Sequence, residues 1–130
     1  MNDKELIDQL KSASESLLWL SESDYPFEVI YWENVDDIKS KLLEVTDCSD
    51  KKIEVRELDR FFKRATEEED WYNNEEMAEC KRYQELVKLL QNHLKDIKVY
   101  RVGEVEVNCY ILGKTESNAI AGLSTISVET

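Results

Sequence analysis

Glycine, proline and histidine are scarce in this sequence, which has three, one and one of them among its 130 residues. Three glycines cannot build a loop that cradles phosphate, and neither a P-loop nor a dinucleotide-binding fingerprint occurs. The single histidine, His93, is expected near the end of a helix, where it would cap backbone carbonyls. Carboxylate pairs are too common at this acidic content to indicate glycosidase chemistry. These shortages argue against an enzyme.

Long apolar runs are missing as well. No segment approaches the roughly 20 apolar residues that a membrane-spanning helix needs. The N-terminal stretch MNDKELIDQL is polar and lacks the apolar middle of a secretory signal. We therefore predict a cytoplasmic protein, and the length fits a single domain covering residues 1–130.

Basic residues are outnumbered, with 17 Lys and Arg against 29 Asp and Glu, so the net charge is −12. Binding of nucleic acid or of an anionic membrane surface requires clustered Lys and Arg, so neither is expected as a direct partner. An acidic surface of this kind suits a basic protein partner, or it serves solubility alone.

Three cysteines are odd in number and far apart, and they form no CxxC pair. They predict neither a disulfide framework nor a zinc site. Cys80 and Cys109 lie on apolar faces of their segments and are expected in the core, whereas Cys48 lies in a polar loop as a free thiol. We expect a reduced protein with no metal ion of its own and no cofactor.

The first two thirds of the chain predict helices with one strand among them. Apolar residues at helical spacing predict a helix over residues 3–20, opened by a capping box of Asn2 and Glu5. Residues 27–32, FEVIYW, predict a strand covered on both faces. A weaker helix is expected over 35–45, a short edge strand over 53–55 and a helix over 57–65. Asn73 and Glu76 predict a second capping box that opens the longest helix, which runs to about Leu94.

The last third changes from helical to strand periodicity. The segments IKVYRV, EVEVNCYIL and AIAGLSTISV predict three strands, joined by connections short enough to make neighbours antiparallel. The order of elements predicts an α+β fold, in which helices pack on a mostly antiparallel sheet.

The stretch TEEEDWYNNEE, residues 66–76, places Trp71 and Tyr72 among six carboxylates. Carboxylates at this density resist burial, whereas large aromatic rings usually belong to a core. Two hypotheses follow for Trp71. Its ring either packs back onto the helix junction and anchors the loop, or it is an interface anchor surrounded by charges that steer a basic partner.

Two further features bear on function. SESD, residues 21–24, is a second acidic turn that either contacts a partner or simply ends a helix. The predicted last strand runs almost to Thr130, so the terminal carboxylate is expected near a folded surface, where it could approach a metal ion or an arginine of another protein.

Three segments together resemble the nuclease A inhibitor family: LLWLSESDYPFEVIYWE, LDRFFKRATEEEDWYNNEE and VYRVGEVEVNCYILGKTESNAIAGLSTISVET. The resemblance covers nearly the whole chain in order, and residues 34–52 are its main departure. It implies a three-layer α/β/α sandwich with a mostly antiparallel sheet, a variant of the pathogenesis-related-protein-1-like fold.

Members of that family bind a sugar-non-specific endonuclease that cuts DNA and RNA with a magnesium ion and a histidine base. The resemblance implies a one-to-one complex that plugs the nuclease active site. The positions that match the family's inhibitory contacts are Glu22, Trp71 and Thr130. Thr130 and Glu22 would approach the partner's magnesium, and Trp71 would occupy space that the substrate strand needs. A supporting acidic and aromatic surface is expected from Asp24, Glu69, Asp70, Tyr72 and Glu75.

The leading hypothesis is therefore a non-enzymatic protein inhibitor of a magnesium-dependent nuclease, monomeric when free. The alternative is an acidic adaptor or regulatory module that shares the fold and binds a different basic protein.

Overall fold

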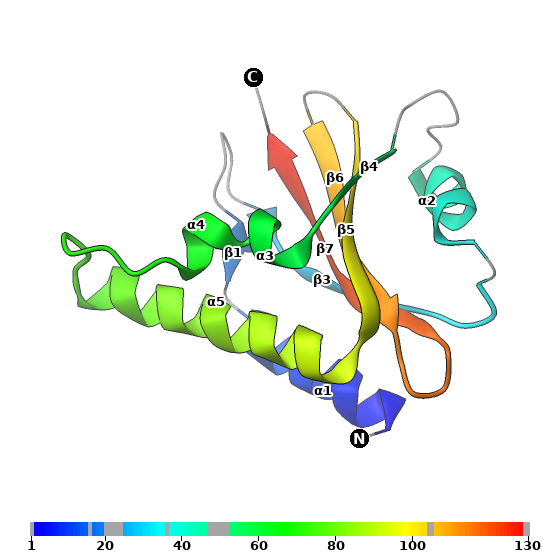
Figure 1. Cartoon of the computed structure of the whole chain (residues 1–130), viewed down its shortest axis with the longest axis horizontal. Helices are drawn as coiled ribbons and strands as arrows, with labels where there is room; N and C mark the ends of the chain where they lie inside the picture. Colours follow the sequence, from blue (N-terminus) through cyan, green and yellow to red (C-terminus); the bar gives the residue numbers. More distant parts are fainter. Residues whose placement is uncertain are drawn as a thin grey trace.

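A five-stranded antiparallel sheet forms the centre of the computed structural model, with helices packed on its faces (Figure 1). The structure describes residues 2–15, 17–19, 25–35, 37–46, 53–103 and 106–128. The helices are α1 (Asp3–Ser14), α2 (Ile38–Thr46), α3 (Leu58–Phe61), α4 (Lys63–Thr66) and α5 (Asn74–His93). The strands are β1 (Leu18–Trp19), β2 (Tyr25–Pro26), β3 (Glu28–Trp32), β4 (Ile53–Arg56), β5 (Lys95–Val102), β6 (Glu106–Lys114) and β7 (Ile120–Val128). The large sheet has the order β3-β7-β6-β5-β4, and β1 pairs with β2 separately. This arrangement confirms the α+β prediction.

Successive residues along the strands of the sheet belong alternately to two separate apolar clusters, one on each face. Val99, Ile111 and Leu123 lie side by side on β5, β6 and β7 and pack against α1 and α5. Their neighbours in sequence, Tyr100 and Leu112, belong to a second cluster that includes Leu42 of α2. Because successive side chains of a strand point to opposite faces, helices cover both sides of the sheet, with α2 on the side away from α1 and α5 (Figure 1).

Strand β3 confirms the prediction of a strand covered on both faces. Val29 and Tyr31 pack against the cluster of α1 and α5, whereas Ile30 and Trp32 pack against the cluster of α2. The predicted edge strand over 53–55 is also confirmed, since β4 is the last strand of the sheet and pairs only with β5 among the described strands.

The predicted strands of the last third are confirmed as an antiparallel meander of β5, β6 and β7. Val107, Cys109 and Ile111 are buried on one face of β6, and Asn108 lies on the other. Gly122 in β7 has a φ of +157°, and a Cβ atom there would lie 1.7 Å from the backbone oxygen of Ile111. Only glycine fits where β6 and β7 approach this closely.

The N-terminus of α1 docks onto the sheet through Asp3. Its carboxylate accepts hydrogen bonds from the hydroxyls of Tyr31 in β3 (2.8 Å), Thr115 (3.2 Å) and Ser117, the last two in the turn between β6 and β7. The bond from Ser117 is the main cause that lowers the pKa of Asp3. The bond to Asp3 raises the pKa of Tyr31 to about 12, because it favours the neutral phenol beside a carboxylate.

Three helix predictions were wrong in their limits. The helix expected over 3–20 ends at Ser14, and Leu18–Trp19 form β1 instead. Arg82 of α5 donates hydrogen bonds to the carbonyls of Ala13 (3.3 Å) and Glu15, which would otherwise lack partners at the helix end. The helix expected over 57–65 is interrupted at Phe62, which separates α3 from α4. The helix expected over 35–45 begins later, at Ile38, and ends at Thr46.

Helix α5 matches its prediction. Asn73 and Glu76 form the capping box, with Glu76 N–H donating to Asn73 Oδ1 at 2.8 Å and Asn73 N–H to Glu76 Oε1 at 3.3 Å. The buried face of the helix consists of Cys80, Tyr83, Leu86, Val87 and Leu90. Leu86 is fully buried although the sequence did not single it out.

Candidate functional site

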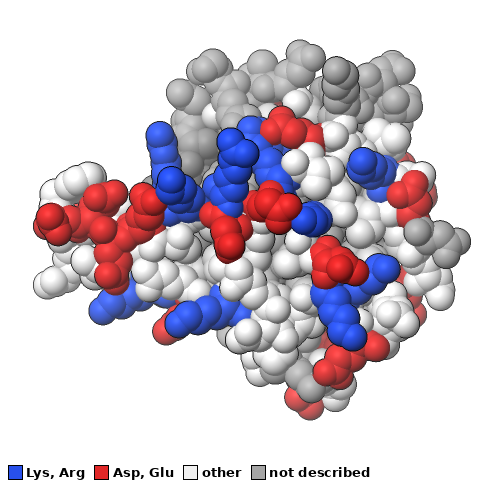
Figure 2. All heavy atoms as spheres, in the orientation of Figure 1, with Lys and Arg blue, Asp and Glu red and all other residues white. Residues whose placement is uncertain are grey.

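The acidic loop, defined as residues 67–73, connects α4 to α5 at the end of the molecule farthest from α2 in the view of Figure 1. In the space-filling view its carboxylates gather around uncharged atoms at this projecting end (Figure 2). The two carboxylates in the first turn of α5, Glu75 and Glu76, continue the same charged surface and are exposed. The loop is therefore presented to solvent by the two helices that flank it.

Local hydrogen bonds shape the acidic loop. The hydroxyl of Thr66, the last residue of α4, donates to the carbonyl of Phe62 at 2.9 Å and closes the final helical turn. The backbone N–H of Tyr72 donates to the carbonyl of Glu69 at 3.1 Å, which makes a turn that contains Asp70 and Trp71. The capping box at Asn73 then starts α5. Carboxylates near this helix start also interact favourably with the positive end of the helix dipole.

Trp71 lies at the tip of the turn with 75% of its surface exposed. Within the described ranges, its recorded ring contact is with Tyr72, at a centroid separation of 6.0 Å and an interplanar angle of 83°. The hypothesis that the indole packs back onto the helix junction was therefore wrong. A large ring left mostly in water gains little burial energy in the folded chain, so its surface remains accessible for contact.

The surroundings of Trp71 are strongly negative. Glu67, Glu68 and Asp70 are exposed, and Glu69 is half-buried. Partial burial raises the pKa of the Tyr72 phenol, and the Glu69 carboxylate is the next cause. Burial likewise raises the pKa of the Cys80 thiol, with further contributions from Glu68 and Glu69. The negative charge of the acidic loop therefore reaches the buried thiol of Cys80 in α5.

A cation would offset part of this charge, and Lys63 lies beside one of the carboxylates, that of Glu67. Its Nζ lies 4.0 Å from Glu67 Oε1, at the limit of an ion pair, and both side chains are largely exposed. Exposed pairs of this kind contribute little, typically ~0–1 kcal/mol. The contact with Lys63 therefore offsets little of the negative charge of the acidic loop.

One residue that holds the loop was missed from the sequence. Gln84 of α5 donates a hydrogen bond from Nε2 to the carbonyl of Thr66 at 2.9 Å. The two residues are 18 positions apart, and no local pattern indicates such a contact. From the sequence, Gln84 was simply a polar residue next to Tyr83 in the predicted long helix.

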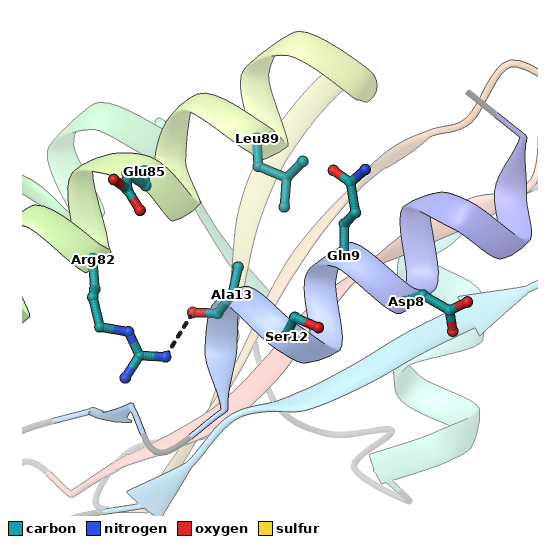
Figure 3. Close-up of a pocket in the computed structure, with 7 residues that line it drawn as sticks. All are labelled: Asp8, Gln9, Ser12, Ala13, Arg82, Glu85 and Leu89. Carbon is teal, nitrogen blue, oxygen red and sulfur yellow. Dashed lines mark hydrogen bonds between the residues drawn. The ribbon is translucent and has the colours of Figure 1, made fainter.

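An open groove of about 480 Å³ lies between α1 and α5 (Figure 3). Asp8 and Ser12 of α1 line it together with Arg82 and Glu85 of α5. The guanidinium of Arg82 points toward the end of α1, where it binds the carbonyl of Ala13 (Figure 3). The guanidinium of Arg82 therefore links α5 to the end of α1, and the groove lies along the packing interface of these two helices.

The structure places the predicted site residues unevenly. It brings Trp71 and Tyr72 together with Glu69, Asp70 and Glu75 on one projecting surface. Glu22, Asp24 and Thr130 lie outside the described residues, as does Cys48, so their predicted roles stay predictions. Cys80 and Cys109 are both buried thiols, which confirms their assignment to the core.

Two classes of site are missing from the part of the chain that the structure describes. No group of three or more His, Cys, Asp or Glu side chains is arranged to hold a metal ion there. Nor does that part contain a helix whose length and apolar character would let it cross a bilayer. The acidic loop presents one large exposed ring and several carboxylates to solvent.

Comparison with known proteins identifies the family to which the chain belongs. No match is found among curated protein sequences. A family model described as nuclease A inhibitor-like protein matches residues 4–130, nearly the whole chain, including the stretch 34–52 where the resemblance was weakest. With that extent of agreement, the chain belongs to the nuclease A inhibitor-like family.

Proposed function

We propose that this protein inhibits a sugar-non-specific, magnesium-dependent nuclease by binding it one-to-one and blocking its active site with the acidic loop. Membership of an inhibitor family supports nuclease inhibition in general. The observation that carries the finer proposal is the 75% exposure of Trp71 among carboxylates at a projecting end of the molecule.

The chemistry of the target fits this surface. A nuclease cleft that accepts DNA and RNA is basic, holds a metal ion and admits both phosphates and bases. The carboxylates of the acidic loop take the place of phosphates, and the indole of Trp71 takes the place of a base. Complementary charge can raise the association rate to about 10⁸ M⁻¹s⁻¹ at low salt, and a buried Trp anchor typically contributes ~2 kcal/mol or more to binding.

Two further contacts belong to the proposal on the ground of the family resemblance. Glu22 and the carboxylate or hydroxyl of Thr130 would approach the partner's magnesium ion. Asp24 would support them, as would the described carboxylates Glu69, Asp70 and Glu75. The inhibitor itself would need no metal ion and no cofactor, since the cation it approaches belongs to the nuclease.

The same proposal covers the remaining properties of the protein. We infer a chain with no catalytic activity of its own that is monomeric when free and acts in the cytoplasm. We also assign the fold more finely to the three-layer α/β/α sandwich of the pathogenesis-related-protein-1-like type. The packing of α1 and α5 on one face of the sheet and of α2 on the other supports that assignment.

The test is a DNA-degradation assay with a magnesium-dependent non-specific nuclease, titrated with this protein. Wild type is expected to abolish cleavage at one equivalent, and Trp71→Ala to weaken inhibition about 30-fold or more. Val55→Ala is the matched control, because Val55 is also an exposed large apolar residue (42%) but lies in β4, away from the acidic loop (Figure 1).

Unchanged inhibition by Trp71→Ala would show that the indole is not the anchor. Absence of inhibition by the wild type, against nucleases of this class that are shown to be active, would contradict the function and favour an adaptor that binds another basic protein.

A further inference from the structure

Helix α5 holds both ends of the acidic loop. At the entry, Gln84 Nε2 donates to the carbonyl of Thr66 at 2.9 Å. At the exit, Asn73 and Glu76 form the capping box that starts α5 itself. The residues between these two ties include Trp71, so one helix determines where the loop begins and where it ends.

The entry is the end that needs a tie. Helix α4 has four residues, Lys63–Thr66, which is too short to be stable through its own hydrogen bonds. The hydroxyl of Thr66 is used within α4, on the carbonyl of Phe62. Gln84 instead binds the backbone carbonyl of Thr66 from a different helix, and this bond adds a polar tie between α4 and α5 to the packing of Ala65 on the core.

The amide of Gln84 is itself held in orientation. Its Nε2 lies 3.8 Å from Sγ of Cys80, one turn earlier on α5, as well as 2.9 Å from the Thr66 carbonyl. Cys80 is buried, and Gln84 is half-buried. The amide nitrogen of Gln84 thus has two contacts that restrict the rotamers of the side chain.

Between the two ties the loop has few conformations left. Tyr72 N–H binds the carbonyl of Glu69, and the Tyr72 ring lies edge-on to the Trp71 ring. If the entry were released, these residues would sample more states in the unbound protein, and binding would have to order them again. Ordering a backbone residue opposes binding by roughly 1–2 kcal/mol, so preorganisation of a loop raises affinity directly.

We propose that Gln84 is a positioning residue for Trp71: by tying the end of α4 to α5, it preorganises the acidic loop so that the indole is presented in its binding geometry before any partner arrives. The consequence for affinity rests on the proposed inhibition of a nuclease. The presentation of the indole is a property of the isolated protein and can be measured without a nuclease.

The test compares Gln84→Met with Gln91→Met. Methionine keeps the length of the side chain and removes the donor. Gln91 makes a similar tie from α5, donating to Asp59 Oδ1 of α3 at 2.8 Å, but it lies about two turns beyond Gln84 and therefore farther from the acidic loop. The protein is labelled with 5-fluorotryptophan, which gives one ¹⁹F resonance for each of the three tryptophans, and Trp71→Phe identifies the resonance of residue 71.

Gln84→Met is expected to shift and narrow the Trp71 resonance toward its position in the urea-unfolded chain, and Gln91→Met to leave it in place. With a nuclease that the wild-type protein inhibits, Gln84→Met is expected to raise the Kd of the complex about threefold to tenfold. Gln91→Met is expected to change this Kd less than about twofold.

A Trp71 resonance in Gln84→Met that superimposes on that of the wild type would overturn the positioning role, whatever the nuclease assay gives. If the resonance shifts while even the wild type inhibits no nuclease, the positioning role stands and the proposed function fails. If both variants shift the resonance equally, the effect comes from general loosening of α5, and the specific role of Gln84 is contradicted.

Discussion

Trp19 and Trp71 are the same residue type in two opposite environments. The ring of Trp19 is stacked on Phe61 with a centroid separation of 4.4 Å and an interplanar angle of 9°, and it makes edge contacts with Phe27, Phe62 and Tyr83. Trp71 contacts the ring of Tyr72 and is otherwise largely in water. The first tryptophan contributes to the free energy of folding. The second is left unpacked by the fold, so burial of its ring in a complex would contribute to the free energy of binding.

The comparison teaches that α3, α4 and α5 connect a packed aromatic region to the acidic loop, the region proposed for recognition. We define the aromatic cluster as Trp19, Phe27, Phe61, Phe62 and Tyr83. Phe61 and Phe62 lie just before the acidic loop in sequence, and Tyr83 lies next to Gln84. Packing in the cluster therefore fixes the same helices that present Trp71. Whether the two regions can be separated is open to experiment.

The largest expected effect is on stability. Trp19→Ala is expected to lower the free energy of unfolding by about 3 kcal/mol or more, because it leaves a cavity among four other rings. Trp71→Ala is expected to change it by less than about 0.5 kcal/mol. Urea denaturation followed by circular dichroism measures both, and equal losses in the two variants would abolish the distinction between the regions.

The next effect concerns charge. Replacing Glu67, Glu68, Glu69 and Asp70 together by their amides is expected to lower the association rate with a basic nuclease about tenfold at low salt. The difference from wild type should shrink as salt shortens the Debye length to about 3 Å at 1 M. Stopped-flow fluorescence measures the rate.

A control with the same change in net charge separates local charge from total charge. It neutralises four exposed carboxylates outside the acidic loop: Asp8, Glu28, Glu44 and Glu106. This variant is expected to keep an association rate close to that of the wild type. If both quadruple variants slow association equally, the acidic loop has no special part in steering.

Alkaline pH should weaken the docking of α1 on the sheet through the titration of Tyr31, which lies outside the acidic loop. The folded-state pKa of Tyr31 is about 12, above its ordinary value of 10.0. Between these values the unfolded chain loses a proton that the folded chain retains, so the free energy of unfolding falls as the pH rises from about 10 to about 12. Tyr31→Phe is expected to make this fall shallower, as measured by urea denaturation at several pH values.

Asp3→Asn provides the reciprocal check on that prediction. Removing the carboxylate should bring the pKa of Tyr31 back toward 10, because the bond to Asp3 is the main cause of its shift. Tyr72→Phe is the comparison in the acidic loop. An identical change of slope in Tyr31→Phe and Tyr72→Phe would show that diffuse negative charge, rather than the contact with Asp3, controls the titration.

The smallest expected effects come from two matched helix caps. Asn2 caps α1 and Asn73 caps α5, and each side chain accepts a hydrogen bond of 2.8 Å from the backbone three residues later. Replacing either by alanine is expected to lower the free energy of unfolding by about 1 kcal/mol. Only Asn73→Ala should also weaken nuclease inhibition, since Asn73 ends the acidic loop. Equal inhibition by the two variants would mean that the exit of the loop needs no fixed geometry.

Much of the fold could be predicted because its signals are local. The capping box of α5, the helical period of α5 and the alternation in β6 depend on residues within a few positions of one another, and all of them are confirmed. At α1 half of the predicted capping box is found: Asn2 accepts from the N–H of Glu5, whereas the Glu5 carboxylate accepts from the side-chain amide of Asn2. The helix limits failed where distant contacts decide. Leu17 continues the leucine spacing of α1, yet it is buried beyond the helix end, and Arg82 from α5 satisfies the carbonyls that the early ending leaves open.

The candidate site divides in the same way. The residue types of the site could be predicted, because six carboxylates around two rings stand out in any sequence. The position of the Trp71 ring could not be predicted, since both a packed and an exposed ring are compatible with the local pattern. Gln84 gave no signal at all, because its partner is a backbone carbonyl and backbone groups carry no sequence identity.

The order of strands in the sheet has a consequence for how the chain is made. Strand β3 pairs with β7 alone among the described strands, and Val29 lies opposite Leu123. During synthesis, the apolar side chains of β3 must therefore stay without their sheet partner until β7, some ninety residues later, has left the ribosome. We expect the sheet to assemble late and slowly, as is typical when contacts join distant parts of a sequence. A ribosome stalled before β7 would hold a chain whose β3 still exposes Ile30 and Trp32, and such a chain should be a substrate for chaperones.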